Sequence, residues 1–316
     1  MSRLPLVVCV VGPTACHKTA LSVQLAKRLD GEILSADSVA VYRGLDVGSA
    51  KPTLAERQGV PHHLLDCADV TDTSFSVAQF KTLANAALDD VLSRRRLPIV
   101  VGGSGMYCDA IFADMTFCAP SDAAIRTAIE SDYEADKNAV FLSLQKVDAE
   151  TASRLHPNDA KRVVRALEVY RITGQPISAL NRRFQAVQEE TQRVHVLRIG
   201  LTMNRQTLYA RIDARVDAMV QNGLVAEAYG LFDQGLTPEL PALQSIGYAQ
   251  LYDAYVGRVT LDAAKQAIKL ATRHFAKRQL TWFRRNPNTQ WFSVDAYPDL
   301  NALEDAVLDV IQKELS

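Results

Sequence analysis

The sequence predicts an α/β fold, in which a parallel sheet is flanked by helices and interrupted by a helical insertion. Short apolar runs typical of buried strands alternate with helical patterns, and they lie at Leu4–Val11, Glu32–Ala36, Pro98–Val101 and Val194–Leu201. Between about Phe117 and Arg193 these strand signals almost vanish, and charge-rich helical segments replace them. We therefore expect a core formed by residues 1–116 and 194–316, with residues 117–193 as the insertion.

The first run leads into Gly12-Pro13-Thr14-Ala15-Cys16-His17-Lys18-Thr19, which has the pattern of a phosphate-binding loop. A helical pattern from Ala20 to Leu29 follows, so backbone N–H groups and a helix dipole would surround one anion. Lys18 would add a positive charge, and the Thr19 hydroxyl would bind Mg²⁺. This order of strand, loop and helix predicts a P-loop NTPase-like core. The usual pattern has glycine where this chain has His17, and the alternative is an ordinary turn with a solvated lysine.

Polar residues also follow the second and third strand-like runs. Asp37 comes directly after the second run, and Ser104 follows the glycines that end the third. Because ligands in such sheets bind at the carboxyl ends of the strands, we expect Gly12, Asp37 and Ser104 to line one crevice. A carboxylate there would bind Mg²⁺ or accept a proton from a substrate. The alternative is a surface aspartate that caps the next turn.

The helical pattern from Asn158 to Ile172 carries a basic face in the predicted insertion. We expect Asn158 or Asp159 to cap its start and Gly174 to end it. Opposite the apolar stripe lie Lys161, Arg162 and Arg165. These side chains either bind the phosphates of a nucleic acid or are simply solvated, as most charged helix faces are.

A second basic row lies on the helical pattern that begins at Asp262, and it consists of Lys265, Lys269, Arg273 and Lys277. The four-residue spacing stacks like charges, which costs a few tenths of a kcal/mol per pair, and no carboxylate follows Asp262 on this helix. A phosphate backbone beside the helix would explain the row; the alternative is acids supplied by another part of the fold. A short strand at Thr289–Val294 and a last helix at Leu300–Leu315 are expected to follow.

The composition narrows the class of protein. The chain has 316 residues, 48% hydrophobic and 22% charged, which is typical of a globular protein of one large or two smaller domains. Its apolar runs are too short to span a bilayer, and the N-terminus resembles no signal peptide, so we expect a cytoplasmic protein without membrane contact. The five cysteines show no metal-binding spacing, and Cys16 alone lies at a predicted helix start, where a thiol pKa is lowered. A small inert residue is the simpler interpretation of Cys16.

Several motifs in order along nearly the whole chain resemble those of the tRNA dimethylallyltransferases (tRNA isopentenyltransferases). They are the phosphate loop, Ser35-Ala36-Asp37-Ser38-Val39-Ala40 with its continuation to Pro52, Pro61-His62-His63-Leu64-Leu65-Asp66, Val101-Gly102-Gly103-Ser104-Gly105-Met106-Tyr107, Asn158-Asp159 through Glu168, Ser245-Ile246-Gly247-Tyr248, and Ala276-Lys277-Arg278-Gln279-Leu280-Thr281-Trp282-Phe283-Arg284. The loop departs from the family at Cys16 and His17, where a small residue and glycine are usual.

This resemblance implies transfer of a dimethylallyl group from dimethylallyl diphosphate to the N6 amine of the adenosine 3′-adjacent to the anticodon (position 37 of the tRNA), in tRNAs that read codons beginning with U. The phosphate loop from Gly12 to Thr19 would hold the diphosphate with Mg²⁺ rather than ATP, and Arg215 would be a second cation for it. Asp37 would take the amine proton, and Ser104 stands where the family usually has threonine. We expect a monomer.

The resemblance also implies the residues that bind the anticodon stem-loop of the tRNA. They are Asp37, Ser38, Val39, Ala40, Ser104, Arg126, Lys161, Arg162, Val163, Val164, Arg165, Gln244, Ser245, Ile246, Gly247 and Tyr248. Three other functions stay open at this point: a prenyltransferase acting on free adenine nucleotides, a small P-loop kinase, and a tRNA-binding protein whose catalysis was lost through His17.

Overall fold

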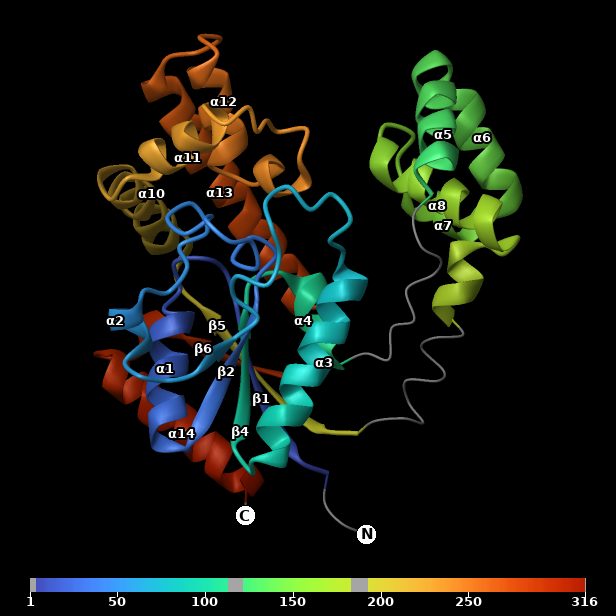
Figure 1. Ribbon diagram of the computed structural model, residues 1–316. Coiled ribbons are helices and arrows are strands. Elements are labelled where there is room, and N and C mark those ends of the chain that lie inside the picture. The colour runs from blue at the N-terminus through green and yellow to red at the C-terminus, as the bar shows by residue number, and fades with distance from the viewer. Residues whose placement is uncertain (1–3, 113–121, 183–192, 316) are drawn as a thin grey trace. The chain divides into compact units, whose positions relative to one another are not determined.

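The computed structural model describes residues 4–112, 122–182 and 193–315 of the protein (Figure 1). The chain divides into two compact units, one formed by Met1–Phe112 with Arg193–Ser316 and the other by Ala113–Gln192. Phe117, where the insertion was predicted to begin, and Cys118 lie outside the described residues.

The first unit is built around a six-stranded sheet of order β3-β2-β4-β1-β5-β6, in which every neighbouring pair is parallel. The strands are β1 (Leu6–Val11), β2 (Gly31–Ala36), β3 (His62–His63), β4 (Leu97–Gly102), β5 (His195–Thr202) and β6 (Thr289–Ser293). The predicted α/β class is therefore confirmed, and each predicted strand is present to within a few residues. The two-residue strand β3 was not predicted, because a pair of histidines has no strand-like pattern.

Helices cover both faces of this sheet, which is why the central strands β1 and β4 are continuous apolar runs. Successive residues of β1 point to opposite faces: Val7 and Cys9 belong to one core cluster, and Val8 and Val10 belong to the other. Figure 1 shows α3 (Val77–Ser93) and α4 (Gly105–Phe112) on one side of the sheet, and α1 (Lys18–Arg28) and α14 (Leu300–Leu315) on the other.

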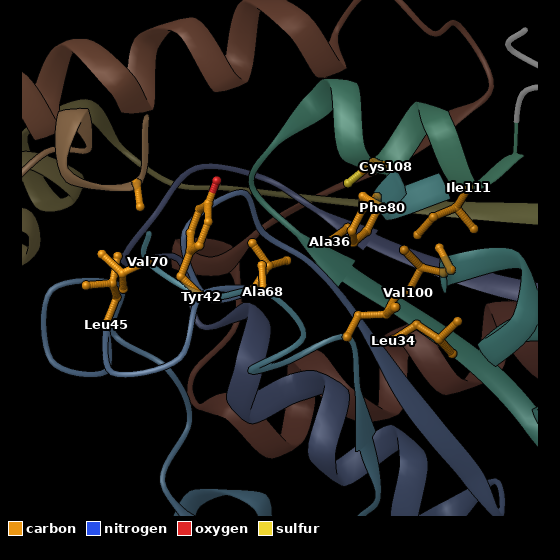
Figure 2. Packing of buried hydrophobic residues seen from close by; sticks show 14 of the residues in the cluster. Leu34, Ala36, Tyr42, Leu45, Ala68, Val70, Phe80, Val100, Cys108 and Ile111 are labelled. Atoms are coloured by element: carbon orange, nitrogen blue, oxygen red, sulfur yellow. The ribbon is translucent and has the colours of Figure 1, made fainter. Parts of the chain in front are cut away.

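The core on the α3 and α4 side positions the two loops that follow β2 and β4. Leu34 and Ala36 of β2 and Val100 of β4 pack against Phe80 of α3 and Cys108 of α4 (Figure 2). All five side chains are fully buried. The end of β2 and the start of α4 are therefore held by tightly packed apolar residues.

The rest of the first unit is mostly helical. It contains α2 (Leu54–Arg57), α10 (Arg205–Gln221), α11 (Leu224–Phe232), α12 (Tyr248–Tyr255) and α13 (Leu261–Phe283), with short 3₁₀ helices at Pro241–Gln244 (η1) and Val294–Ala296 (η2). Thr260 begins α13 by accepting a hydrogen bond from the Ala263 N–H.

The second unit contains α5 (Ala123–Ala135), α6 (Lys137–Val147), α7 (Ala149–Arg154) and α8 (Ala160–Thr173) around its own apolar cluster. The predicted helix α8 is present and ends at Gly174, which adopts the left-handed conformation with φ of 68°. Asp159 is the N-cap residue, but its side chain makes no capping bond and instead pairs with Arg162 at 3.1 Å. Asp159 is therefore at the predicted cap position, but without the side-chain hydrogen bond of a usual N-cap.

Candidate active site

The loop between β1 and α1 curls at three residues with positive φ. Gly12 has φ of 145°, and a Cβ there would lie 2.5 Å from the carbonyl oxygen of Leu201, so this position requires glycine. Ala15 and His17 have φ of 63° and 59°. His17 is the N-cap residue of α1 and adopts the left-handed conformation that the usual pattern fills with glycine.

Lys18 is the first residue of α1, and its side chain bonds back to this loop. Its Nζ donates a hydrogen bond of 2.7 Å to the carbonyl oxygen of Pro13. Burial lowers the pKa of Lys18 to about 8, and the positive charge of Arg215 acts in the same direction, while the carboxylate of Asp37 opposes them. An anion at the ammonium group would raise this pKa again.

Arg215 projects from α10 and belongs to the same cluster of charges. Burial lowers its pKa, and Asp37 acts against that shift. The sequence could not show that α10 passes this edge of the sheet. The structure thus brings Lys18, Asp37 and Arg215 close enough for their charges to interact.

Asp37 follows β2 directly and is held by the turn it begins. Its Oδ1 accepts hydrogen bonds from the N–H groups of Val39 at 2.8 Å and Ala40 at 3.1 Å. The turn-capping alternative is therefore part of the structure, and it fixes the orientation of the carboxylate.

Ser104 ties the loop after β4 to the loop after β2. Its Oγ accepts a hydrogen bond from the Ser38 N–H at 3.1 Å and lies 3.1 Å from the Ser38 hydroxyl. Because β2, β4 and β1 are neighbours in the sheet, the loops that carry Asp37, Ser104 and Gly12 lie side by side. The three loops therefore meet at one edge of the sheet as expected from the sequence, while a crevice between them and the chemical roles of these residues stay predictions.

Two further residues hold the phosphate loop and were missed in the sequence. Gln279 of α13, which is buried, accepts a hydrogen bond from the Thr14 N–H and donates one to the Gly103 carbonyl oxygen, both at 2.9 Å. Arg211 of α10 donates to the carbonyl oxygen of Ala15 at 3.0 Å. Gln279 did lie within a quoted motif, but nothing in the sequence indicated which segment it would contact.

Neither unusual residue of the loop is charged at neutral pH. Burial raises the pKa of the Cys16 thiol to about 11, so the interpretation of Cys16 as a small inert residue is confirmed. Burial and the charge of Arg211 lower the pKa of His17 below its usual value. The imidazole is therefore neutral and adds no positive charge to the site.

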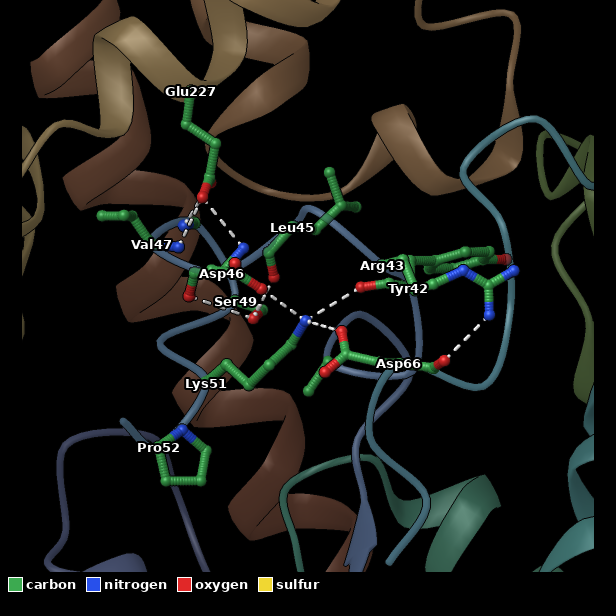
Figure 3. Close-up of polar contacts among 12 residues, drawn as sticks. Tyr42, Arg43, Leu45, Asp46, Val47, Ser49, Lys51, Pro52, Asp66 and Glu227 are labelled. Carbon is green, nitrogen blue, oxygen red and sulfur yellow. Dashed lines mark hydrogen bonds and ion pairs between the residues drawn. The ribbon is translucent and has the colours of Figure 1, made fainter. Parts of the chain in front are cut away.

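A buried lysine shapes the chain that continues from Asp37. The Lys51 ammonium donates to Asp46 at 2.6 Å, to Asp66 at 2.5 Å and to the Tyr42 carbonyl oxygen at 3.0 Å (Figure 3). These contacts join two of the motifs named above, because the first supplies Lys51 and the second supplies Asp66.

The residues of α8 expected to bind tRNA differ in accessibility. Lys161 and Arg162 are exposed, whereas the side chains of Val163 and Val164 are buried in the core of the second unit and can present only their backbone. Arg165 and Arg126 both donate to the fully buried carboxylate of Glu168 at 2.8 Å. A shared acid therefore orients these two arginines and partly neutralises them.

Acids account for three of the four members of the basic row on α13, so those three need no phosphate backbone to explain them. Lys269 pairs with Asp217 at 2.7 Å, Arg273 forms a two-point ion pair with Asp213, and Lys265 lies 3.6 Å from Asp262. For Lys269 and Arg273 the alternative, acids supplied by another part of the fold, is confirmed, because Asp213 and Asp217 belong to α10. Lys277, the last member of the row, is exposed.

The predicted segment Gln244–Tyr248 connects η1 to α12. Gln244 is exposed, Ser245 and Ile246 are half-buried, and Tyr248 is fully buried. Gly247 has φ of 106°, and its N–H donates to the Gln250 side chain at 2.8 Å. The side chains from Gln244 to Ile246 are thus accessible to a nucleic acid, while the buried Tyr248 anchors the segment.

Residues 40–286 match the family model described as IPP transferase. The chain belongs to the IPP transferase family. It is 46% identical over 290 residues to a tRNA dimethylallyltransferase of Geobacillus thermodenitrificans, covering 91% of this chain and 90% of the relative. A protein named tRNA dimethylallyltransferase 2 from Geotalea uraniireducens is also 46% identical, over 92% of each chain.

Solved structures of IPP transferases have the same fold. The full-length tRNA isopentenylpyrophosphate transferase of Bacillus halodurans is 40% identical, with a TM-score of 0.73, covering 99% of this chain and 97% of the other. A eukaryotic dimethylallyltransferase acting on tRNA is 28% identical, with a TM-score of 0.81, covering 98% of this chain and 80% of the other. In the described residues of this family member, no helix is long and apolar enough to cross a membrane.

Proposed function

We propose that this protein transfers the dimethylallyl group of dimethylallyl diphosphate to N6 of the adenosine 3′-adjacent to the anticodon, in tRNAs that read codons beginning with U, and releases diphosphate. Family membership supports this reaction, since its named relatives match more than nine-tenths of this chain. The observation that carries it in the structure is the joining of a phosphate loop to Asp37 and Ser104 at one edge of the sheet.

The donor diphosphate would bind the loop between β1 and α1. The N–H groups at the start of α1, the Lys18 ammonium and the Arg215 guanidinium all favour a polyanion there. These groups also stabilise diphosphate as it leaves, which matters because an adenine amine is a weak nucleophile and the allylic carbon must develop positive charge.

Asp37 would take the proton from the amine. Both of its backbone hydrogen bonds go to Oδ1, so we assign proton acceptance to Oδ2. The new bond joins N6 to the allylic carbon, the bond from that carbon to the diphosphate oxygen breaks, and the N6 proton passes to Asp37. Ser104 would support this step by holding the turn through Ser38.

The loop fits Mg²⁺ as the accompanying ion. The exposed Thr19 side chain at the start of α1 is an oxygen ligand of the kind that Mg²⁺ accepts beside phosphate oxygens and water. No group of three or more His, Cys, Asp or Glu side chains in the described part of the chain could hold a metal. When bound there with the donor, the ion would neutralise charge on the diphosphate.

The tRNA would be held by its phosphates through the exposed face of α8, chiefly Lys161 and Arg162, with the pair Arg126 and Arg165 oriented by Glu168. In the first unit the turn from Asp37 to Ala40 and the segment Gln244–Tyr248 would face the anticodon loop. The target base would have to leave the stack to reach Asp37. We further propose a cytoplasmic monomer.

The reaction is tested with the full chain, Mg²⁺, radiolabelled dimethylallyl diphosphate and unmodified tRNA, followed by digestion and nucleoside analysis. Label on the adenosine beside the anticodon is the expected result. A parallel reaction with AMP in place of tRNA tests transfer to free nucleotides, and ATP hydrolysis without the prenyl donor tests the kinase alternative. Label on AMP alone, or hydrolysis without transfer, would refute the proposal.

A further inference from the structure

A single carboxylate joins two parts of the first unit that are far apart in sequence. Glu227, on α11, accepts hydrogen bonds from the N–H groups of Asp46 at 2.9 Å and Val47 at 2.7 Å through Oε2. Its Oε1 accepts from the Gly48 N–H at 2.9 Å and from the Tyr248 hydroxyl at 2.5 Å. Figure 3 shows the glutamate reaching down from its helix onto these consecutive backbone nitrogens.

The four donors come from two segments. Asp46, Val47 and Gly48 belong to the loop that starts at Asp37, and Tyr248 is the first residue of α12. The segments are also in close contact, because a Cβ on Gly48 would lie 2.5 Å from the Tyr248 ring. Burial and the neighbouring Glu227 raise the pKa of Tyr248, so its hydroxyl stays protonated as the donor.

We propose that Glu227 is a positioning residue for the tRNA: it fixes the loop that continues from Asp37 against the segment Gln244–Tyr248. The inference rests on the proposed function, in which both segments face the anticodon loop. A carboxylate suits this task because it accepts from three successive N–H groups and a hydroxyl at once, which no neutral side chain of similar size does.

The loop that continues from Asp37 also has hydrogen bonds and ion pairs that do not involve Glu227. Lys51 holds Asp46 and Asp66, and the Asp37 carboxylate is held by the N–H groups of its own turn. Within the described residues, the bonds of Lys18 and the phosphate loop go to Pro13, Gln279 and Arg211 and not to Glu227. Changing Glu227 should therefore affect the fit of the tRNA and leave binding of the diphosphate donor intact.

The direction in which the tRNA affinity changes distinguishes a positioning role of Glu227 from a simple effect of its negative charge. Removing an acid near a bound nucleic acid ordinarily strengthens binding, because repulsion of the phosphates falls. A positioning role predicts the opposite for Glu227→Gln, in which the amide NH₂ cannot accept from two of the four donors. Glu239 is an exposed acid beyond the end of α11, so Glu239→Gln is the matched control for charge.

The experiment measures the KM and kcat for tRNA, the Kd for tRNA without donor, and the Kd for dimethylallyl diphosphate. For Glu227→Gln we expect a KM and Kd for tRNA about tenfold higher, equivalent to about 1.4 kcal/mol, with the donor Kd within about twofold of wild type. Tyr248→Phe, which removes one of the four bonds, should raise the tRNA Kd by about two- to threefold. Glu239→Gln should leave it unchanged or lower it.

An unchanged or lower tRNA Kd for Glu227→Gln would overturn the inference, and so would an equal loss of donor affinity. Should Glu227→Gln fail to fold, Tyr248→Phe decides, because a tRNA Kd equal to that of wild type contradicts positioning through this contact. Wild-type protein that transfers no prenyl group would refute the proposed function, while the tRNA Kd values would still test the positioning role.

Discussion

Replacing His17 with glycine should stabilise the first unit without abolishing its function. A residue other than glycine with φ of 59° is held in the left-handed region at a cost of about 1–2 kcal/mol. Glycine removes that cost but adds about 0.4–1 kcal/mol of entropy to the unfolded chain. The difference between these two ranges is about 0–1.6 kcal/mol in favour of glycine, which corresponds to a rise in Tm of at most about 6 °C for a unit of this size.

Tryptophan fluorescence can follow this unit alone. The chain has two tryptophans, Trp282 and Trp291, and both belong to the first unit. Ala15→Gly is a matched control for relief of backbone strain without loss of an imidazole, because Ala15 has φ of 63° and no ring. His17→Ala removes the imidazole and keeps the strained conformation, so it should not be stabilised. A lower Tm for His17→Gly than for His17→Ala would refute the strain argument.

The same variant tests the charge state of the imidazole. The pKa of His17 is lowered in the folded protein, so the unfolded state binds more protons and this residue's contribution to stability is lost as pH falls below about 6.5. The stability advantage of His17→Gly should therefore grow as pH falls through this range. Donor affinity should show the same pH dependence in both proteins near neutrality. A wild-type dependence that disappears in His17→Gly would mean that the imidazolium contacts the diphosphate.

Asp37→Asn should keep the affinity for tRNA and lower kcat by about 10²–10⁴-fold, and a variant that retains a third of the wild-type rate would exclude the general base. Lys18 has a pKa of about 8 in the free protein, so donor affinity should fall as pH rises through about 8, with a limiting slope of tenfold per pH unit. Lys18→Met should bind the donor weakly and without that slope. Lys161→Ala combined with Arg162→Ala should lower the slope of log Kd against log salt for tRNA by about one per lost phosphate contact, and an equal slope would mean that this face is only solvated.

The sheet and its loops were open to prediction because their signals are local. Strands covered on both faces are largely apolar, so β1 and β4 are continuous apolar runs and β2 is apolar apart from Glu32 and Ser35. The three runs stop at Gly12, Asp37 and the glycines before Ser104. The topology of a parallel sheet then brings these ends together, whatever the details of packing.

The contacts between helices were not open to prediction. Asp213 and Asp217 stand on α10, more than forty residues before their partners on α13, so a single helix appeared to lack its acids. Glu227 and Gln279 are single polar residues within amphipathic helices, and only the packing of those helices decides which backbone groups they meet. The sequence contains the donors and acceptors but does not contain their pairing.

The bridge made by Gln279 has a consequence for how the site tolerates change. A carboxamide offers one acceptor to Thr14 and one donor to Gly103 while carrying no charge, so the bridge is independent of pH and adds no net charge beside a bound phosphate. A glutamate would lack the donor, a lysine would lack the acceptor, and an asparagine is one methylene shorter. The connection between the two loops therefore depends on the carboxamide of Gln279. It does not use the charges of Lys18 and Arg215, which can act on the substrate.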